Sequence, residues 1–461
     1  MAFESTLTSE KIESLVDEKK YAALRTLFEP MEAADIALLL DDMPSGRLPL
    51  LFRLLPKEQA AEVFVELGSD MQELLITSFS NTELREILEE LYVDDTVDII
   101  EEMPANVVKR ILRHCDPHTR KTVNEILKYP EDSAGSLMTT EFIDLKESMT
   151  VADAFKRIRR TATDKETINV CYVTDPHRKL IGLVTIRALV LAEEEDTIAE
   201  VMDENVVSVT TMEDREEVVQ AFSRYDFIAL PVVDTESRLV GIITVDDALD
   251  VLEEETTEDI GKMAAITPSG RPYLKNSVWD ICKSRVMWLL ILMLSSTFTG
   301  IILAHFESKL SALLCLSAFI PMLMGTGGNS GSQSSVTIIR GISLREIEFS
   351  DVLRVIWKEL RVSVLCGALL GVACFLKIML IDYRVLPSLA AADAPVMVAL
   401  AVSLTLAATV VLAKLVGCVL PLLADKLGFD PAVMASPFIT TIVDALSLLL
   451  YFYFASLVLG I

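Results

Sequence analysis

The sequence predicts a multidomain protein: an α-superhelical N domain, an α+β tandem pair, an acidic connecting helix and a five-span α-helical membrane domain. Two internal duplications, an uneven charge distribution and five long apolar segments support this prediction. Residues 1–270 carry 27 Lys and Arg against 57 Asp and Glu, a net charge of −30, whereas residues 271–461 carry 14 against 11, a net charge of +3. Such acidity disfavours nucleic acid as a partner, because phosphate contacts need clustered Lys and Arg, and it suits cations.

The first duplication defines the N domain, residues 1–132. Residues 34–44, ADIALLLDDMP, resemble residues 94–104, DDTVDIIEEMP. Helical periodicity surrounds both copies and prolines punctuate the turns, which is typical of stacked helix pairs. The opening residues, MAFESTLTSEKIESLVDEKK, lack the apolar core of a signal peptide. We therefore expect this half to remain in the cytoplasm.

A second duplication covers residues 133–200 and 201–245. YVTDPHRKLIGLVTI matches VVDTESRLVGIITV, with Gly182 aligned to Gly241, and LMTTEFIDL matches VMDENVVSV upstream. Each copy predicts a strand, helix, strand, Asp-containing turn, strand and helix. This pattern resembles a tandem pair of CBS modules, which implies an α+β fold that binds regulatory ligands.

The resemblance to CBS pairs also raises the question of an adenine nucleotide. Such pairs often hold one through a Thr-x-x-Asp motif that begins the last helix of a module. Thr244 and Asp247 complete the motif in the second copy, whereas the first copy has Thr185 followed by Ala188 at the acidic position. One of the two motifs is thus incomplete, and the sequence leaves nucleotide binding open.

The connecting segment, residues 246–270, begins with the acidic run DDALDVLEEETTEDIGKM. It could be a solvated acidic helix, but it leads directly to the membrane domain, which favours a regulatory cation site. The carboxylates expected to build that site are Asp94, Asp95, Glu216, Asp226, Asp247, Asp250, Glu255, Glu258 and Asp259. Oxygen ligands select Mg²⁺, Ca²⁺ or Mn²⁺ over Zn²⁺, and the four histidines do not cluster in the sequence.

The membrane domain, residues 271–461, contains five apolar segments, each long enough to supply the roughly 20 residues that a spanning helix needs. They cover roughly 286–304, 310–339, 362–381, 394–423 and 433–460. A large soluble helical core is the alternative, but a run such as SLLLYFYFASLVLG is unsuited to water. Lys and Arg gather before the first span and between the second and third. By the positive-inside rule, the N-terminal half is cytoplasmic and the C-terminus lies outside the cell membrane.

The second apolar segment changes character at residues 321–335, PMLMGTGGNSGSQSS. A P-loop is excluded because no Lys lies between Lys309 and Arg340. About 14 apolar residues precede the change, too few to span, so the polar stretch lies at membrane depth. Non-helical backbone is tolerated there only where it is buried or lines a water-filled path. We therefore expect the helix to break and to expose glycine carbonyl oxygens along a pore.

The last span supplies one charge, Asp444, within SPFITTIVDALSLLLYF. An ionisable group at membrane depth costs about 2.5–3.5 kcal/mol or more and marks a functional position by default. The alternative is a boundary position from which the carboxylate reaches water. We expect no intramembrane Lys or Arg to accompany Asp444, which disfavours an anion substrate and leaves a passing cation as its partner.

Three motifs together resemble the MgtE-type magnesium transporters and channels: YPEDSAGSLM at 129–138, PMLMGTGGNSGSQ at 321–333 and ASPFITTIVD at 435–444. The resemblance covers almost the whole chain and implies a non-enzymatic homodimer with its pore on the two-fold axis. It also implies these pore residues: Asp444, Gly325, Gly328, Asn329, Ser332, Ser436 and Thr440. Some relatives have Asn in place of Ser332 and Ser436, which bears on selectivity.

The implied function is Mg²⁺ influx down its electrochemical gradient, closed by cytoplasmic Mg²⁺ at the acidic N-domain, CBS and connecting-helix surfaces. A CBS-regulated channel for Mn²⁺ or Co²⁺ is the nearest alternative. Two alternatives are more distant: a CBS-regulated transporter of an anion or osmolyte, and a membrane-tethered enzyme. No nucleophile–base pair or cofactor loop in the sequence supports the enzyme.

Overall fold

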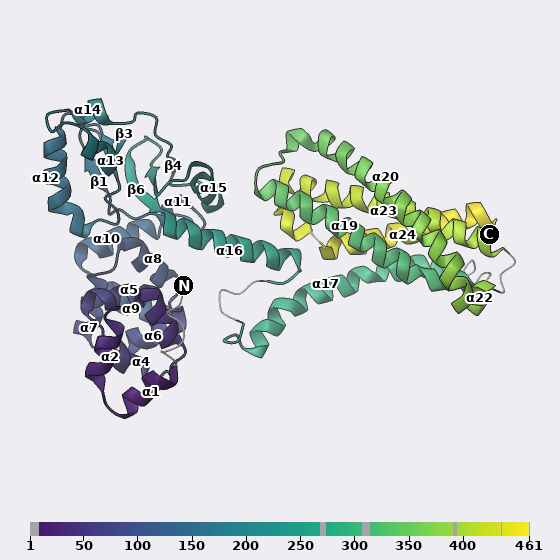
Figure 1. Cartoon of the computed structure of the whole chain (residues 1–461), viewed down its shortest axis with the longest axis horizontal. Coiled ribbons are helices and arrows are strands. Elements are labelled where there is room, and N and C mark those ends of the chain that lie inside the picture. Colours follow the sequence, from purple (N-terminus) through teal and green to yellow (C-terminus); the bar gives the residue numbers. More distant parts are fainter. Residues whose placement is uncertain (1–8, 268–272, 307–313, 391–393, 435, 461) are drawn as a thin grey trace. The chain divides into compact units, whose positions relative to one another are not determined.

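The computed structural model describes residues 9–267, 273–306, 314–390, 394–434 and 436–460 (Figure 1). The chain forms two compact units, Met1–Leu252 and Glu253–Ile461, and each has its own apolar core. The boundary falls within one helix, α16 (Val245–Met263), so the two ends of this helix belong to different units. The predicted connecting segment ends at residue 270, and its residues 268–270 lie outside the described part of the chain.

Short helices build the N-terminal part of the first unit. Their bounds are α1 (Ser9–Asp17), α2 (Tyr21–Phe28), α3 (Ala33–Asp41), α4 (Leu48–Phe52), α5 (Lys57–Val65), α6 (Ser69–Ser78), α7 (Asn81–Leu88), α8 (Val93–Glu102), α9 (Ala105–His114) and α10 (Pro117–Ile126). α3 and α8 are the two copies of the predicted duplication. A buried Met followed by Pro comes after each of them, because proline cannot continue the helical hydrogen bonding. The predicted helical N domain is confirmed.

Two three-stranded sheets follow, and they confirm the predicted CBS pair. The elements are α11 (Ala134–Leu137), β1 (Ile143–Leu145), α12 (Val151–Thr161), β2 (Val170–Thr174), β3 (Leu180–Thr185), α13 (Ile186–Leu191), α14 (Ile198–Val201), β4 (Val209–Thr210), α15 (Arg215–Tyr225), β5 (Ala229–Val233) and β6 (Leu239–Thr244). In each sheet the strands follow chain order, with a parallel pair and then an antiparallel pair. Equal topology is what an internal duplication requires.

The aligned glycines have a structural reason, because the segment that begins each copy crosses the sheet of the other copy. Backbone bridges mark the crossings at Thr139–Ile242 and Leu183–Asp203. A Cβ atom on Gly182 would lie 2.7 Å from Met202 Sδ, and one on Gly241 would lie 2.7 Å from Met138 Sδ. Only glycine leaves room for the crossing chain at these two positions.

The second unit is helical (Figure 1). Its long helices are α17 (Val278–His305), α19 (Ile320–Ser343), α20 (Val352–Lys377), α23 (Pro395–Lys426) and α24 (Ser436–Leu459). Shorter pieces are the 3₁₀ turns Leu314–Phe319, Phe349–Asp351 and Pro431–Met434, the π-helix Ile378–Asp382, α21 (Tyr383–Val385) and α22 (Pro387–Ala390). α23 packs against α19, α20 and α24 and has the largest share of buried residues, so it forms the centre of this unit.

Within the described residues, four helical stretches are long and apolar enough to cross a membrane: Val278–His305, Phe349–Val385, Pro395–Lys426 and Pro431–Leu459. They coincide with four of the five predicted spans. The remaining predicted span, 310–339, overlaps α19 (Ile320–Ser343). Residues 310–313 of that prediction lie outside the described chain. The Gly, Ser, Asn and Gln residues of α19 lower its hydropathy, so the count of five apolar spans is not reproduced.

The expected break in the helix at 321–335 is wrong. α19 runs without interruption over Ile320–Ser343. Its glycines serve close packing, since a Cβ on Gly327 or Gly331 would lie 2.7 Å from a side chain of α23 or α24. A helix can therefore carry this polar sequence through the unit without opening its backbone.

Candidate functional site

A group of carboxylates converges at the start of α8 in the first unit. Asp94 of α8, Glu141 before β1 and Glu166 before β2 each place an oxygen within 4.8 Å of the others. Asp94 is only 5 % exposed, and the two glutamates are partly buried. Carboxylates this close repel one another unless a cation lies between them. The arrangement suits a hard divalent cation, which prefers oxygen ligands.

Glu141 and Glu166 differ in their hydrogen bonding within the described part of the chain. The backbone N–H of Val93 and the hydroxyl of Thr139 both donate to Glu141 Oε2 at 3.1 Å. Glu166 Oε2 is buried and accepts no hydrogen bond from the described residues. A buried unsatisfied oxygen costs about 1–3 kcal/mol, and a bound cation would offset that cost.

Asp247, at the start of α16, adds its charge to this group. The Thr244 hydroxyl donates to Asp247 Oδ2 at 2.7 Å and orients the carboxylate. Burial, and then the charge of Asp247, raise the pKa of Asp94 well above its usual range. Burial also raises the pKa of Asp247, with further contributions from Asp246 and Asp95. The connecting helix and α8 thus share one electrostatic site within the first unit.

Burial also raises the pKa of the neighbouring carboxyl groups. Burial raises the pKa of Asp95 to about 6. Burial, together with the charges of Asp95 and Asp247, raises the pKa of Glu166 to about 8. Glu166 therefore holds a proton near neutral pH, whereas Asp95 is largely ionised, and cation binding at Glu166 releases that proton. We name Asp94, Asp95, Glu141, Glu166 and Asp247 the α8 carboxylate group.

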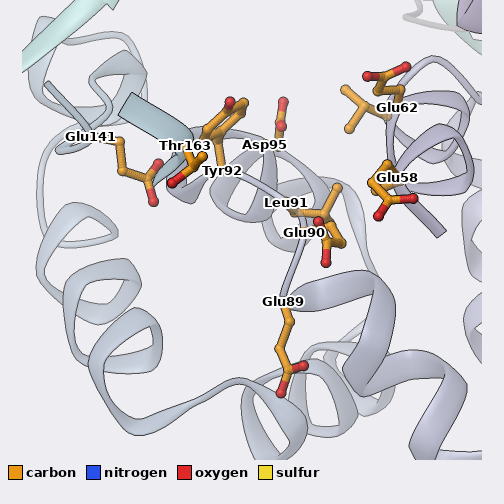
Figure 2. Close-up of a pocket in the computed structure, with 11 residues that line it drawn as sticks. Glu58, Glu62, Glu89, Glu90, Leu91, Tyr92, Asp95, Glu141 and Thr163 are labelled. Carbon is orange, nitrogen blue, oxygen red and sulfur yellow. The ribbon is translucent and has the colours of Figure 1, made fainter. Parts of the chain in front are cut away.

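A cavity of about 470 Å³ adjoins this group (Figure 2). Figure 2 shows Glu58 and Glu62 on one side, Glu141 on the other, and Asp95 with Tyr92 between them. Its full lining is Glu58, Ala61, Glu62, Val65, Glu89, Glu90, Leu91, Tyr92, Asp95, Glu141 and Thr163. The acidic lining gives the cavity a negative potential that concentrates hydrated cations beside the α8 carboxylate group.

The sequence anticipated three of the five members of the α8 carboxylate group. Asp94 is one of the three residues whose oxygens lie within 4.8 Å of one another, whereas Asp95 and Asp247 act on that group through their charges. Glu216 and Asp226 are exposed on α15 and at its end, Asp250 is exposed, and Glu255 is partly buried on α16. Among the described residues, none of these four belongs to a group of three ligand residues within 4.8 Å. Glu141 and Glu166 were missed, because no short spacing connects them to α8.

The end of α16 makes a second polar cluster, within the second unit. Lys262 Nζ lies 2.5 Å from Glu258 Oε1 and 2.6 Å from Asp430 Oδ2. The Ser343 hydroxyl donates to Asp259 Oδ2 at 3.4 Å. Glu258 and Asp259 were expected in a regulatory site, whereas Lys262 and Asp430 were missed. We name these four charged residues the α16 end cluster.

The candidate ion path lies where α19 meets α24. A Cβ on Gly328 would lie 2.9 Å from Thr440 Cγ2, and one on Gly327 would lie 3.0 Å from Ser447 Oγ. Asp444 is partly buried, one turn after Thr440 on the same helix. The small residues of α19 therefore bring its backbone close to α24, the helix that carries Asp444.

The polar face of α19 stays accessible beside this contact. Gly325 and Asn329 are exposed, and the Ser332 hydroxyl donates to the Gly328 carbonyl at 2.9 Å. The Thr440 hydroxyl donates to the Pro437 carbonyl at 2.9 Å. An asparagine exposed on a helix at membrane depth is costly against lipid, so this face borders water or another protein surface. Ser436 begins α24, and its side chain is outside the described part of the structure.

The expectation that the membrane domain has no intramembrane Lys or Arg is wrong. Lys414 lies within α23 and is 7 % exposed. Its Nζ lies 3.6 Å from Glu359 Oε1 on α20. Since Glu359 balances the charge of Lys414, this lysine does not supply a free positive charge for an anion.

Family models match three parts of the chain. The MgtE intracellular N domain matches residues 31–132, the CBS domain matches residues 134–195 and 198–254, and the MgtE divalent cation transporter domain matches residues 320–454. The fold and the sites define a membrane transport protein with a CBS-containing N-terminal part.

Curated relatives extend the similarity over nearly the full length. The magnesium transporter MgtE of Thermus thermophilus is 38 % identical over 452 residues, which are 97 % of this chain and 98 % of that protein. The magnesium transporter MgtE of Bacillus subtilis is 30 % identical over 443 residues, 96 % of this chain and 95 % of that protein. The chain therefore belongs to the MgtE family of magnesium transporters, which are transport proteins and not enzymes.

Solved structures cover about half of the chain. The cytosolic domain of the Mg²⁺ channel MgtE, in complex with ATP, shares 39 % identity with a TM-score of 0.51 and covers 53 % of this chain and all of that chain. The soluble part of a magnesium transporter shares 26 % identity with a TM-score of 0.50 and covers 54 % of this chain and 97 % of that chain. Both support the helical N domain and the CBS pair.

Proposed function

We propose that this protein is a channel for Mg²⁺ influx, with the ion path along α19 and α24. The observation that carries the proposal is the position of Asp444, which follows Thr440 on α24 where that helix contacts the glycines of α19. Gly325, Gly328, Asn329, Ser332, Ser436 and Thr440 complete the proposed lining. Because Mg²⁺ dehydrates reluctantly, we propose that it passes largely hydrated, with the Asp444 carboxylate contacting its water shell.

The driving force is the membrane potential. A divalent cation gains about 4.6 kcal/mol per 100 mV of inside-negative potential, twice the value for one charge. We propose that the N-terminal half is cytoplasmic, that the C-terminus is outside, and that the protein is a homodimer in the cell membrane whose two copies of Asp444 face one path. The exposed polar face of α19 supports the dimer, because a second copy would cover it.

We further propose that cytoplasmic Mg²⁺ closes the channel. At high internal Mg²⁺, the ion binds the α8 carboxylate group and draws α16 toward α8. At low internal Mg²⁺, the members of the group that are ionised repel one another and release the helix. The proposed regulatory residues include Glu216, Asp226, Asp250 and Glu255 on the neighbouring acidic surface, together with Glu258 and Asp259.

The transport proposal is tested in proteoliposomes with an inside-negative potential and low internal Mg²⁺. We expect wild type to take up Mg²⁺ and Asp444→Ala to lose uptake, while Asp382→Ala serves as a control carboxylate outside the proposed path. Equal uptake by wild type and Asp444→Ala would remove Asp444 from the path. Competition by Mn²⁺ and Co²⁺ in the same assay separates the Mg²⁺ channel from its nearest alternative.

The regulatory proposal needs a separate measurement. Asp247→Asn, Asp250→Asn and Glu258→Gln combined should leave influx intact at low internal Mg²⁺ and weaken its inhibition at high internal Mg²⁺. Unchanged inhibition in the triple variant contradicts the sensor role and leaves the transport proposal standing.

An adenine nucleotide is a second ligand that the CBS pair could hold. The observation in favour is the Thr244–Asp247 hydrogen bond of 2.7 Å, which fits the expected motif, and the similar cytosolic domain was solved with ATP. We propose one nucleotide per chain, at the second CBS copy, because Ala188 lacks the carboxylate. Equilibrium dialysis with ATP tests this, and Asp247→Asn should abolish the binding.

A further inference from the structure

A buried charge cluster joins three helices of the membrane unit. Lys414 of α23 points its ammonium at the Glu359 carboxylate of α20, with 3.6 Å between Nζ and Oε1. The same ammonium donates to Ser334 Oγ of α19 at 3.4 Å. The Ser334 hydroxyl in turn donates to Glu359 Oε1. Lys414 is 7 % exposed and Ser334 is 3 % exposed, so water screens these contacts little.

Stability alone gives little reason to keep such a cluster. Apolar residues of similar volume stabilise a protein interior as well as a buried ion pair does, because desolvation of the charges offsets their attraction. In some proteins, a buried polar or ionic group instead fixes one arrangement of the elements around it. An intramembrane Lys is therefore a candidate for a functional role with a named partner.

The role concerns α19, because Ser334 is the α19 residue that the charge pair holds. Gly327 and Gly331 bring α19 close to α23 and α24 but supply no side chain that could bond to those helices. Ser334 supplies α19 with two directional contacts on its buried face. Asn329, five residues earlier, lies about 140° around the helix at 100° per residue and is exposed. Fixing Ser334 therefore fixes the direction in which Asn329 points.

We propose that Lys414 and Glu359 are positioning residues: through Ser334 they fix the rotation of α19 and so set the ion selectivity of the path. This inference rests on the proposed function, because it requires α19 to line that path. Lys414 does not contact the ion. It holds the helix whose other face carries Asn329 and Ser332.

Ser334→Ala tests the inference with little risk to folding, because it keeps both charges and removes only their link to α19. In proteoliposomes of the full-length protein, we expect the ratio of Mg²⁺ to Co²⁺ uptake to change by about fivefold, the effect of one net hydrogen bond. Ser296→Ala, on α17, is the matched control, because its hydroxyl bonds within its own helix. A wild-type ratio in Ser334→Ala overturns the inference.

The charge pair is tested by rescue. Lys414→Met leaves Glu359 buried without its cation, and we expect uptake per folded molecule to fall about tenfold or more. Adding Glu359→Gln removes the stranded charge and keeps an acceptor for Ser334, so uptake should recover while the ion ratio stays altered. A double variant with the wild-type ratio shows that the pair does not position α19. Absence of divalent uptake in wild type overturns the proposed function itself, and this inference with it.

Discussion

Lys262 Nζ lies 2.6 Å from Asp430 Oδ2, and this ion pair ties the last turn of the connecting helix to the segment that precedes α24. The same ammonium pairs with Glu258 at 2.5 Å. These carboxylates hold the pKa of Lys262 above its usual value despite the opposing effect of partial burial. Met263, the next residue, packs with Ile339 of α19 and with Ala432. A lysine thus bridges carboxylates at the point where the proposed regulatory ion would act.

Lys262→Met should make closure depend more strongly on Mg²⁺. The substitution keeps an apolar stem but removes the ammonium, so Glu258, Asp259 and Asp430 repel one another until a divalent cation replaces it. Partly exposed pairs contribute about 1 kcal/mol or less, which corresponds to about a fivefold change. We expect higher influx at low internal Mg²⁺ and a steeper inhibition curve, measured in proteoliposomes. Lys156→Met, which removes an exposed pair with Asp153, is the control. Identical inhibition curves for Lys262→Met and wild type would refute this prediction.

Glu166→Gln should change the stability of the cation-free and the cation-bound α8 carboxylate group in different ways. Near and above pH 8, where Glu166 ionises, glutamine removes its repulsion from Asp94 and Glu141. It also removes the cost of burying an ionised oxygen that accepts no hydrogen bond from the described residues. In a chelator the variant should unfold at a higher temperature than wild type, and Mg²⁺ should raise that temperature less. The exposed Glu204→Gln is the matched control. A variant with the full Mg²⁺ effect would exclude Glu166 as a ligand.

The same group predicts how stability changes with pH. The folded protein holds the pKa of Asp95 at about 6 and that of Glu166 at about 8, above their values in an unfolded chain. The folded state therefore binds more protons than the unfolded state between about pH 4 and pH 8. The contribution of these two groups to stability is greatest below their unfolded pKa values and is lost as pH rises through their folded ones.

The measurement is thermal unfolding of the full-length protein from pH 5 to pH 8, with chelator or with Mg²⁺. With chelator, the unfolding temperature should fall as pH rises. With Mg²⁺ the slope should flatten, because the cation stabilises the deprotonated carboxylates. Parallel slopes in the two conditions would show that Mg²⁺ does not bind at these groups.

Much of the fold follows from repetition in the sequence. The duplications around Gly182 and Gly241 predict the two matching sheets, and the structure shows why glycine is needed there. Hydropathy predicts four of the membrane helices. The predicted break in α19 is wrong. Gly, Ser and Asn suggest an open backbone there, whereas packing against α23 and α24 keeps the helix intact.

The sites are less accessible to sequence reasoning. Asp444 stands out as one carboxylate in an apolar run. Glu141 and Glu166 join Asp94 only through tertiary packing, and no spacing in the chain encodes that proximity. Lys414 had a sequence signal, a single cation inside an apolar segment, but its partner Glu359 is 55 residues away and only the fold reveals the pair.

The closest approach of α19 and α23 provides a last prediction. A Cβ on Gly417 would overlap the backbone oxygen of Gly331, and neither backbone can move without separating the helices. We expect Gly417→Ala to lower the free energy of unfolding by about 1–3 kcal/mol, the usual cost of overpacking. It should also reduce Mg²⁺ uptake, because α19 shifts away from α23. Gly300→Ala on α17 meets nothing within 4 Å and should be neutral or stabilising, since alanine favours the helix. Thermal unfolding and Mg²⁺ uptake of the two variants test this prediction. If Gly417→Ala is as stable and as active as Gly300→Ala, α19 and α23 do not meet at Gly331 and Gly417.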